Sequence, residues 1–187
     1  MRSTLPLFAL AIASAAPVLA TEAIPVPAFR SVELRGGGSV TVVPGPSQRV
    51  TILEGSSQFT HMRVERNGQL KINTCDQRCP PHYRLRVQVQ APSVPDLAIS
   101  GGGLINVGNG FRAQRELNAA VNGGGKIDAR AVDVGDVAAA VNGGGELLVR
   151  ARSNLSAAVN GGGLVRYWGN PRVASAIHGG GAVSPGH

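Results

Sequence analysis

Six Gly-Gly-Gly triplets punctuate the 187-residue chain, and the last five recur every 18 to 22 residues. Three of these five follow the same four residues, Ala-Ala-Val-Asn. A repeat of about 20 residues is typical of a solenoid, in which each copy forms one coil stacked on the next. The repeat therefore constrains the architecture of the chain much more than its function. The six triplets begin at Gly36, Gly101, Gly123, Gly143, Gly161 and Gly179.

Apolar side chains alternate with polar or small ones on both sides of the triplets. In the copy around Gly123, Leu117, Val121 and Ile127 share one parity, and the residues between them are mostly polar. Successive side chains of a β-strand point to opposite faces, so this pattern predicts strands with one buried face. Glycine adopts backbone angles that other residues avoid, which lets each coil turn a corner. We therefore expect an all-β, parallel β-helix-like solenoid whose equivalent valines form a buried column: Val121, Val141 and Val159.

Residues at equal offsets from successive triplets should lie side by side in such a stack. Lys126 should then form an ion pair with Glu146, and Arg150 should lie over the indole of Trp168 as a cation–π contact. The residues that precede the triplets should form a polar ladder: Ser100, Asn122, Asn142, Asn160 and His178. A flat strip of small residues should run beside this ladder: Ala98, Ala120, Ala140, Ala158 and Ala176.

The N-terminal half has strand-like alternation without the regular repeat. We expect residues 29–95 to form an antiparallel or irregular β section that closes one end of the stack, and residues 96–184 to form the repeat coils. Asn67-Gly68 favours a two-residue hairpin inside this section. Pro185 cannot donate to a further strand and should end the stack. The expected N-terminal strands are Phe29–Arg35, Ser39–Val43, Arg49–Leu53, His61–Arg66, Gln69–Asn73 and Tyr83–Gln90.

The first 20 residues have the pattern of a secretory signal peptide. Arg2 gives a positive start, Leu5–Ala16 an apolar stretch, and Val18–Ala20 a small-residue cleavage site. The apolar stretch is too short to cross a bilayer, so we do not expect a membrane-spanning protein. We expect residues 1–20 to be removed and residues 21–187 to form a single domain, periplasmic or secreted to the cell surface.

The chain is basic, with 18 Lys and Arg against 11 Asp and Glu and a formal net charge of +7. Arginine pairs well with carboxylate and phosphate, so a basic exported protein could bind anionic envelope polysaccharide or lipid headgroups. The charge on its own nevertheless favours the simpler interpretation, a solvated arginine-rich surface with no ligand. Nucleic acid is not an expected partner, because export separates the protein from it and no basic run with interleaved aromatic residues occurs.

The two cysteines, Cys75 and Cys79, have three residues between them. In an oxidising compartment such a pair favours a local disulfide, which would contribute about 2 kcal/mol on the chain-entropy model. The segment TCDQRCPPH is also similar to the CxxxCP copper-binding turn of Sco-type assembly proteins, with His82 as a third ligand. A metal-handling or redox module at this loop is therefore the second hypothesis.

Catalytic and cofactor motifs are missing from the sequence. Neither GxxxxGK[ST] nor a helix-opening GxGxxG occurs, so we expect no nucleotide cofactor. The closest pair of acids in the coils, Asp133 and Asp136, falls in the segment Val132–Asp136, which we interpret, like Gly169–Arg172, as a variable linker. No glycosidase-type pair of carboxylates can be nominated. A glycan-active enzyme is therefore the last-ranked hypothesis.

Three segments give the chain a family resemblance: FRSVELRGGGSVTVVPG, NGQLKI and RLRVQVQAPSVPDLAISGGG, followed by the triplet coils. In this order they resemble the putative auto-transporter adhesin head GIN domain family, from Phe29 to about Ser184. The resemblance implies a β-solenoid of an exported bacterial protein and brings no catalytic residues.

These observations lead to one functional hypothesis, a non-enzymatic binding or adhesion module of the bacterial envelope. Its partner would be envelope polysaccharide, anionic lipid or another protein. Side chains of outward parity near the C-terminal end of the repeats would contact an anionic partner: Arg130, Arg150, Arg166 and Trp168.

Overall fold

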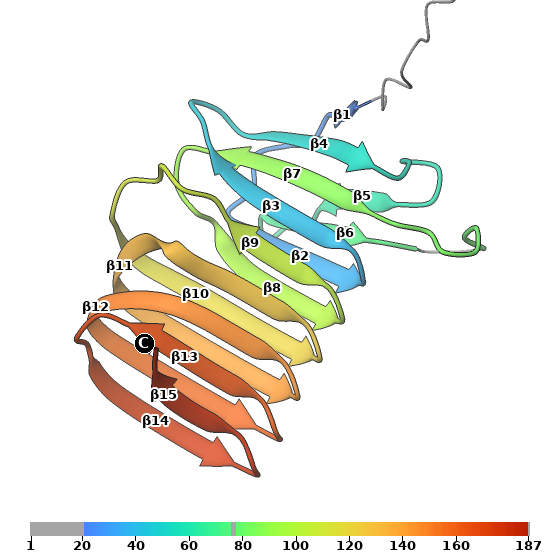
Figure 1. Ribbon diagram of the computed structural model, residues 1–187. Coiled ribbons are helices and arrows are strands. Elements are labelled where there is room, and N and C mark those ends of the chain that lie inside the picture. Colours follow the sequence, from blue (N-terminus) through green and yellow to red (C-terminus); the bar gives the residue numbers. More distant parts are fainter. Residues whose placement is uncertain (1–20, 76–77, 187) are drawn as a thin grey trace, which may run out of the picture.

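The computed structural model describes residues 21–75 and 78–186, and every regular element in these residues is a β-strand. All 15 strands join one continuous sheet, which folds into two facing walls (Figure 1). The described residues contain no helix that could cross a membrane. The expected signal peptide, residues 1–20, lies outside the described residues.

The strands that precede the triplets form the first wall, named here the alanine wall. Its neighbouring strands are all parallel. In order along the stack it contains β6 (Gln69–Asn73), β2 (Ser31–Gly36), β8 (Asp96–Gly101), β10 (Gln114–Gly123), the C-terminal parts of β11 (Lys126–Gly143) and β12 (Glu146–Asn160), and β14 (Arg172–His178).

The strands that follow the triplets form the second wall, named here the arginine wall. These strands also pair in parallel, and the glycine corners line up along one edge of the molecule (Figure 1). The wall contains β7 (Arg86–Ala91), β3 (Ser39–Pro44), β9 (Leu104–Val107), the N-terminal parts of β11 and β12, β13 (Leu164–Trp168) and β15 (Ala182–Pro185).

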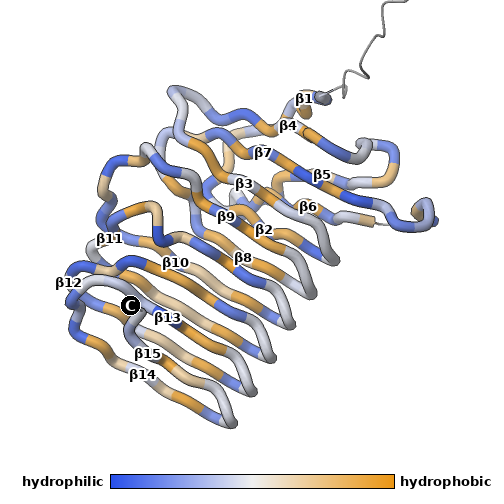
Figure 2. Tube along the Cα trace, in the orientation of Figure 1, coloured by the Kyte–Doolittle hydropathy of each residue, from blue (hydrophilic) through white to orange (hydrophobic). Residues whose placement is uncertain are grey.

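The register of the repeats agrees with the sequence pattern. Each strand of the alanine wall pairs at equal offsets from its triplet, so the predicted column of valines forms, and all three valines are 0% exposed. Figure 2 shows the resulting alternation of apolar and polar residues along the strands. The predicted polar ladder is also in register: Ser100, Asn122, Asn142, Asn160 and His178.

The corner after β11 shows why the triplets are glycine. Gly143 has a φ of 119°, and a Cβ at this position would lie 2.6 Å from the carbonyl oxygen of Gly123 in the coil below. The amide of Gly144 donates to that same carbonyl at 3.1 Å. A Cβ at Gly144, by contrast, would meet nothing within 4 Å. The first glycine of this corner is therefore required by backbone angle and by close approach of the coils.

The N-terminal section differs from its prediction in one respect. Antiparallel pairing is present, between β4 (Arg49–Glu54) and β7, between β5 (His61–Val64) and β6, and between β1 (Glu22–Ile24) and β4. However, β2 and β3 pair in parallel with the repeat strands β8 and β9. The first triplet thus forms a corner like the later ones, and its coil belongs to the stack instead of to a separate closing section.

The interpretation of Val132–Asp136 as a linker is wrong. The segment lies inside the 18-residue strand β11, and Val132 and Val134 are fully buried. The chain turns from one wall to the other here through shifts of register and stays extended, because the apolar alternation continues through the turn. The second expected linker, Gly169–Arg172, is present except for its last residue: residues 169–171 connect β13 to β14, and Arg172 begins β14.

Candidate functional site

A polar hollow of about 390 Å³ opens on the arginine wall, at the end of the strands away from the glycine corners. The loop after β9 forms one side of it, and side chains from β11, β12 and β13 form the other. Three of the four residues predicted to contact an anionic partner are in its lining. The lining residues are Asn106, Val107, Gly108, Asn109, Asp128, Arg130, Ala131, Arg150 and Trp168.

A cation–π contact spans the hollow. The guanidinium carbon of Arg130 lies 4.9 Å from the centre of the Trp168 ring. Arg130 is on β11 and Trp168 on β13, so the contact reaches across the intervening strand β12. The sequence predicted Arg150 in this position, because Arg150 is the direct neighbour of Trp168 in register. That prediction is wrong.

Asp128 explains why Arg130 takes this position. Its Oδ1 accepts from Arg130 Nε at 2.9 Å, and its Oδ2 accepts from Arg130 Nη2 at 2.6 Å. Partial burial of Asp128 opposes its ionisation, but the hydrogen bonds from the Arg130 side chain and backbone outweigh it, so the pKa of Asp128 lies below its usual value. The same hydrogen bonds raise the pKa of Arg130. The bidentate pair aims the guanidinium at the indole.

The other side of the indole packs against the end of the described chain. Gly186 donates its amide to the carbonyl of Tyr167 at 2.7 Å. A Cβ at Gly186 would lie 2.2 Å from Cε2 and Cζ2 of Trp168, so only glycine fits against the six-membered ring. Trp168 is therefore held between a cation and the backbone, and it is better placed to orient Arg130 than to stack on a ligand.

Arg150 and Arg166 keep more of their hydrogen-bonding capacity. Asp133 accepts from Arg152 Nη2 at 2.5 Å, while Arg150 Nε stays 3.8 Å from the other oxygen of this carboxylate. Arg166 has no ion pair or side-chain hydrogen bond in the described part of the chain. Both arginines are exposed on the arginine wall, on the neighbouring strands β12 and β13. Their donors are available to an external carboxylate or phosphate.

Sequence reasoning missed three polar residues of the hollow. Asn106 and Asp128 are in register on β9 and β11, and Asn109 lies in the loop that follows β9. The shared offset of Asn106 and Asp128 from their triplets could have revealed the first two. Asn109 could not be found in this way, because its loop has no counterpart in the later coils.

The predicted ion pair between Lys126 and Glu146 is present on the same wall, with Nζ 2.6 Å from Oε2. Leu148 departs from the pattern, because it has outward parity but is only 3% exposed. It stands in register between Asp128 and Arg166, so the long side chains of this wall cover it.

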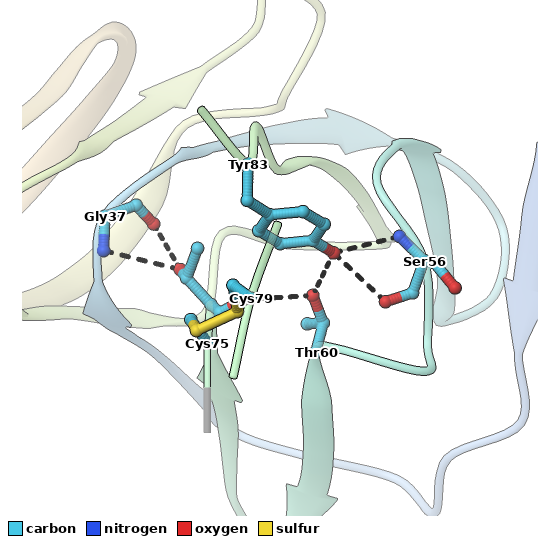
Figure 3. The surroundings of a disulfide bond; sticks show 7 residues. Gly37, Ser56, Thr60, Cys75, Cys79 and Tyr83 are labelled. Carbon is cyan, nitrogen blue, oxygen red and sulfur yellow. Dashed lines mark hydrogen bonds between the residues drawn. A yellow bond between two sulfur atoms is a disulfide. The ribbon is translucent and has the colours of Figure 1, made fainter. Parts of the chain in front are cut away.

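The predicted disulfide is present between Cys75 and Cys79, whose Cα atoms are 6.1 Å apart (Figure 3). Its loop takes the place of a triplet corner, because β6 pairs with β2 and β7 with β3 on either side of it. Both thiols are used by the disulfide, and the described residues contain no group of three or more His, Cys, Asp or Glu side chains that could hold a metal ion. The arrangement therefore gives the metal-handling hypothesis no support.

Hydrogen bonds fix the surroundings of this loop. The hydroxyl of Thr74 donates to the carbonyl of Gly37 in the next coil, and the hydroxyl of Tyr83 lies 2.8 Å from that of Thr60 (Figure 3). Tyr83 also accepts from the amide of Ser56 at 2.9 Å. The loop is thus bound to two neighbouring segments and has a structural role that needs no ligand.

The alanine wall offers a second, shallow groove of about 370 Å³, whose lining includes four residues of the predicted strip: Ala98, Ala120, Ala140 and Ala158. Its one charged lining residue, Asp96, accepts from the backbone and side-chain amides of Asn118 at 3.0 and 3.2 Å. Beside the strip, Asn142 donates to Asn122 and Asn160 donates to Asn142, each at 2.9 Å. These amide groups satisfy one another, so the wall has little capacity left for a charged ligand.

A family model described as "Putative auto-transporter adhesin, head GIN domain" matches residues 28–115 and 113–171 of the chain. The comparison with curated protein sequences gives no match. Among solved structures, a putative adhesin from Bacteroides fragilis is similar at 16% identity, over 89% of this chain and 96% of that one, with a TM-score of 0.54. This similarity concerns the fold alone.

Two structures from Parabacteroides distasonis match less well. A putative adhesin is 17% identical over 89% of this chain and 96% of its own, with a TM-score of 0.41. A protein described as a putative lipid binding protein is 16% identical over 90% of this chain and 96% of its own, with a TM-score of 0.39. At these TM-scores neither structure supports an argument about this chain.

Proposed function

Because the chain belongs to the head GIN domain family of putative auto-transporter adhesins, we propose that it is an exported, non-enzymatic binding module of the bacterial envelope. After removal of residues 1–20, residues 21–187 would form one β-solenoid domain, with a triplet at one corner of each repeat coil. The name of the family and that of the similar structure from Bacteroides fragilis support this proposal, since both are names of putative adhesins.

The polar hollow of the arginine wall carries the proposal, together with Arg166, which lies on β13 outside the lining of the hollow. Arg130 is oriented and neutralised by Asp128, whereas Arg150 and Arg166 keep donors that point to no carboxylate within hydrogen-bonding distance among the described residues. Arg166 pairs with Leu148 and Arg150 with Trp168, so the two arginines are diagonal neighbours on adjacent strands, and their backbone positions are about 8 Å apart. This spacing suits a partner that presents charges repeatedly, and not a single small anion.

The chemistry of the lining favours an acidic polysaccharide over a lipid surface. Asn106, Asn109 and Asp128 offer amide and carboxylate groups that hydrogen-bond to sugar hydroxyls, while arginine binds uronate carboxylates. A lipid-binding site would need apolar side chains able to enter the acyl region, and the hollow exposes few. We therefore propose that the arginine wall binds an acidic envelope polysaccharide.

The test is equilibrium binding of the purified protein to polygalacturonate, with dextran as the neutral polymer and vesicles containing phosphatidylglycerol as the lipid arm. We expect binding to polygalacturonate that weakens as salt rises, because exposed charges are screened. Binding to dextran with equal affinity would contradict the electrostatic role, and binding to the vesicles alone would assign the wall to lipid.

Two double variants, each with two arginines changed to glutamate, locate the site. Arg150→Glu with Arg166→Glu should weaken polygalacturonate binding at least tenfold. Arg66→Glu with Arg84→Glu makes the same change of net charge on exposed residues of the N-terminal section and should have little effect. Equal weakening by both pairs would show that net charge, and not the arginine wall, controls binding.

A further inference from the structure

The alanine wall ends in an open edge. Its last strand, β14, pairs with β12 on one side and with no strand of the described chain on the other. All seven residues of β14 are exposed. Exposed edge strands are usually protected by proline, lysine, a bulge or a covering segment, because their free amides and carbonyls can pair with another chain. Within β14 the one charged residue is Arg172 at its first position, and residues 173–177 include no proline or charged side chain.

Two large apolar side chains are left uncovered at this edge. Val173 and Ile177 have the inward parity of the buried columns, pairing with Leu155 and Val159, but they are 40% and 43% exposed. The residues that they pair with are 1% and 0% exposed. The core of the stack is therefore open at β14, and one further strand over this edge would cover both side chains.

The sequence of β14 is nearly symmetric about Ser175. Reading outward from this residue gives Ala174 and Ala176, then Val173 and Ile177, and then the polar Arg172 and His178. An antiparallel copy of the same strand, centred on Ser175, would place Val173 against Ile177 of the second copy and alanine against alanine. The five central residues, 173–177, are thus complementary to themselves in size and polarity, and the outermost pairs place Arg172 beside the imidazole of His178.

The backbone amides and carbonyls of β14 that face the open edge are placed correctly for this antiparallel register. The carbonyl of His178 accepts from Gly161 at 2.8 Å, so it faces the body of the stack. Because amide and carbonyl directions alternate along a strand, the groups of Val173, Ser175 and Ile177 face the open edge. In the antiparallel arrangement centred on Ser175, these three residues form hydrogen-bonded pairs, each exchanging two N–H···O bonds with its opposite residue.

We propose that β14 is a dimerisation edge that pairs antiparallel with β14 of a second copy of this chain, about a two-fold axis at Ser175. The other wall does not compete for this role, since β15 is only four residues long and ends at Pro185. The dimer would place two arginine walls in one particle, so it is compatible with the proposed function but does not depend on it.

Sedimentation velocity over a range of protein concentrations tests the association. We expect twice the monomer mass for the natural protein and at least a tenfold higher dissociation constant for Ile177→Lys. The matched control is Ala176→Lys, which places the same charge on the same strand, with its side chain on the outer surface instead of in the core, and should dimerise normally. A monomer at all concentrations overturns the proposal, as does a dimer that Ile177→Lys leaves unchanged.

Cysteine cross-linking tests the register. In the proposed register Ala174 faces Ala176 of the partner in a non-hydrogen-bonded pair, where opposite Cβ atoms come closest to the separation in a disulfide. The double variant Ala174→Cys with Ala176→Cys should therefore form a covalent dimer on mild oxidation, and Ala176→Cys alone, which faces an alanine, should not. Equal cross-linking of the two variants would contradict the register, and a monomeric protein whose β14 pairs with a strand of a different protein would contradict self-association.

Discussion

Arg130 holds its guanidinium 4.9 Å from the ring centre of Trp168, although a whole strand lies between the two residues. One neighbour of each residue holds the two side chains in this contact. Asp128, which is on the same strand as Arg130, accepts two hydrogen bonds from the guanidinium, and Gly186 packs against the indole of Trp168. The contact and the ion pair with Asp128 engage Arg130, whereas Arg150 and Arg166 stay exposed beside it with no close carboxylate among the described residues.

Arg130→Ala tests this contact through the only tryptophan of the chain. Loss of the guanidinium should expose the indole to water and shift its fluorescence emission to longer wavelength. The free energy of unfolding should fall by about 0.5–1 kcal/mol, as for other exposed cation–π contacts. Arg152→Ala is the control, because Arg152 pairs with Asp133 and not with Trp168. An unchanged emission spectrum in Arg130→Ala would contradict the contact.

Asp128→Asn tests the ion pair through its pH dependence. The folded-state pKa of Asp128 is depressed, so its carboxylate stabilises the fold above the unfolded value of about 4, and this stabilisation is lost as the pH falls through the folded pKa. The variant should be less stable than the natural protein at pH 7 by up to about 1 kcal/mol, because the pair is partly solvent-screened. Urea denaturation at several pH values should show the difference closing in acid. A difference that widens in acid would contradict the assignment.

Neighbouring glycines in one corner should respond in opposite ways to the same substitution. Gly143→Ala places a Cβ at a positive φ and against the carbonyl of Gly123, so it should lower the free energy of unfolding by about 2 kcal/mol or more. Gly144→Ala meets open space at an ordinary φ and should be neutral or stabilise by about 0.4–1 kcal/mol. Thermal denaturation of the two variants measures both values. Equal destabilisation would show that the corner does not have this backbone.

Removal of the disulfide should weaken one end of the stack without affecting the arginine wall. Cys75→Ser with Cys79→Ser opens a short loop and should cost at most about 2 kcal/mol of stability. The hydrogen bonds of Thr74 and Tyr83 should still hold the loop in place. Denaturation measures the stability, and polygalacturonate binding should be unchanged. A loss of binding in this variant would link the loop to the ligand.

The sequence was sufficient to predict the regular part of the fold. The pairing of Asn122 with Asn142 and Asn160 followed from offsets to the triplets, because a repeat that stacks on itself places equal positions side by side. The same reasoning predicted the contact of Lys126 with Glu146. The spacing of the two cysteines, together with the oxidising compartment that the expected signal peptide implies, predicted the disulfide.

One prediction was wrong because two arginines on neighbouring strands were both long enough to contact Trp168. Arg150 is next to Trp168 in register, yet Arg130 makes the contact, because Asp128 lies two residues before it on the same strand and aligns its guanidinium. A second error is the linker expected at Val132–Asp136, because Val132 and Val134 continue the apolar alternation and are buried within β11. The register of the strands determines which backbone positions are neighbours, but it does not determine the direction in which an arginine side chain points.

Fluorescence titration of Trp168 with polygalacturonate is the most direct test of the proposed binding site. Trp168 lines the hollow and is the only tryptophan, so its emission reports on this position alone. We predict a saturable change at low salt that is lost in the variant carrying Arg150→Glu and Arg166→Glu and kept in the variant carrying Arg66→Glu and Arg84→Glu. No change in the natural protein at low salt, or the same change in both variants, would contradict binding at the arginine wall.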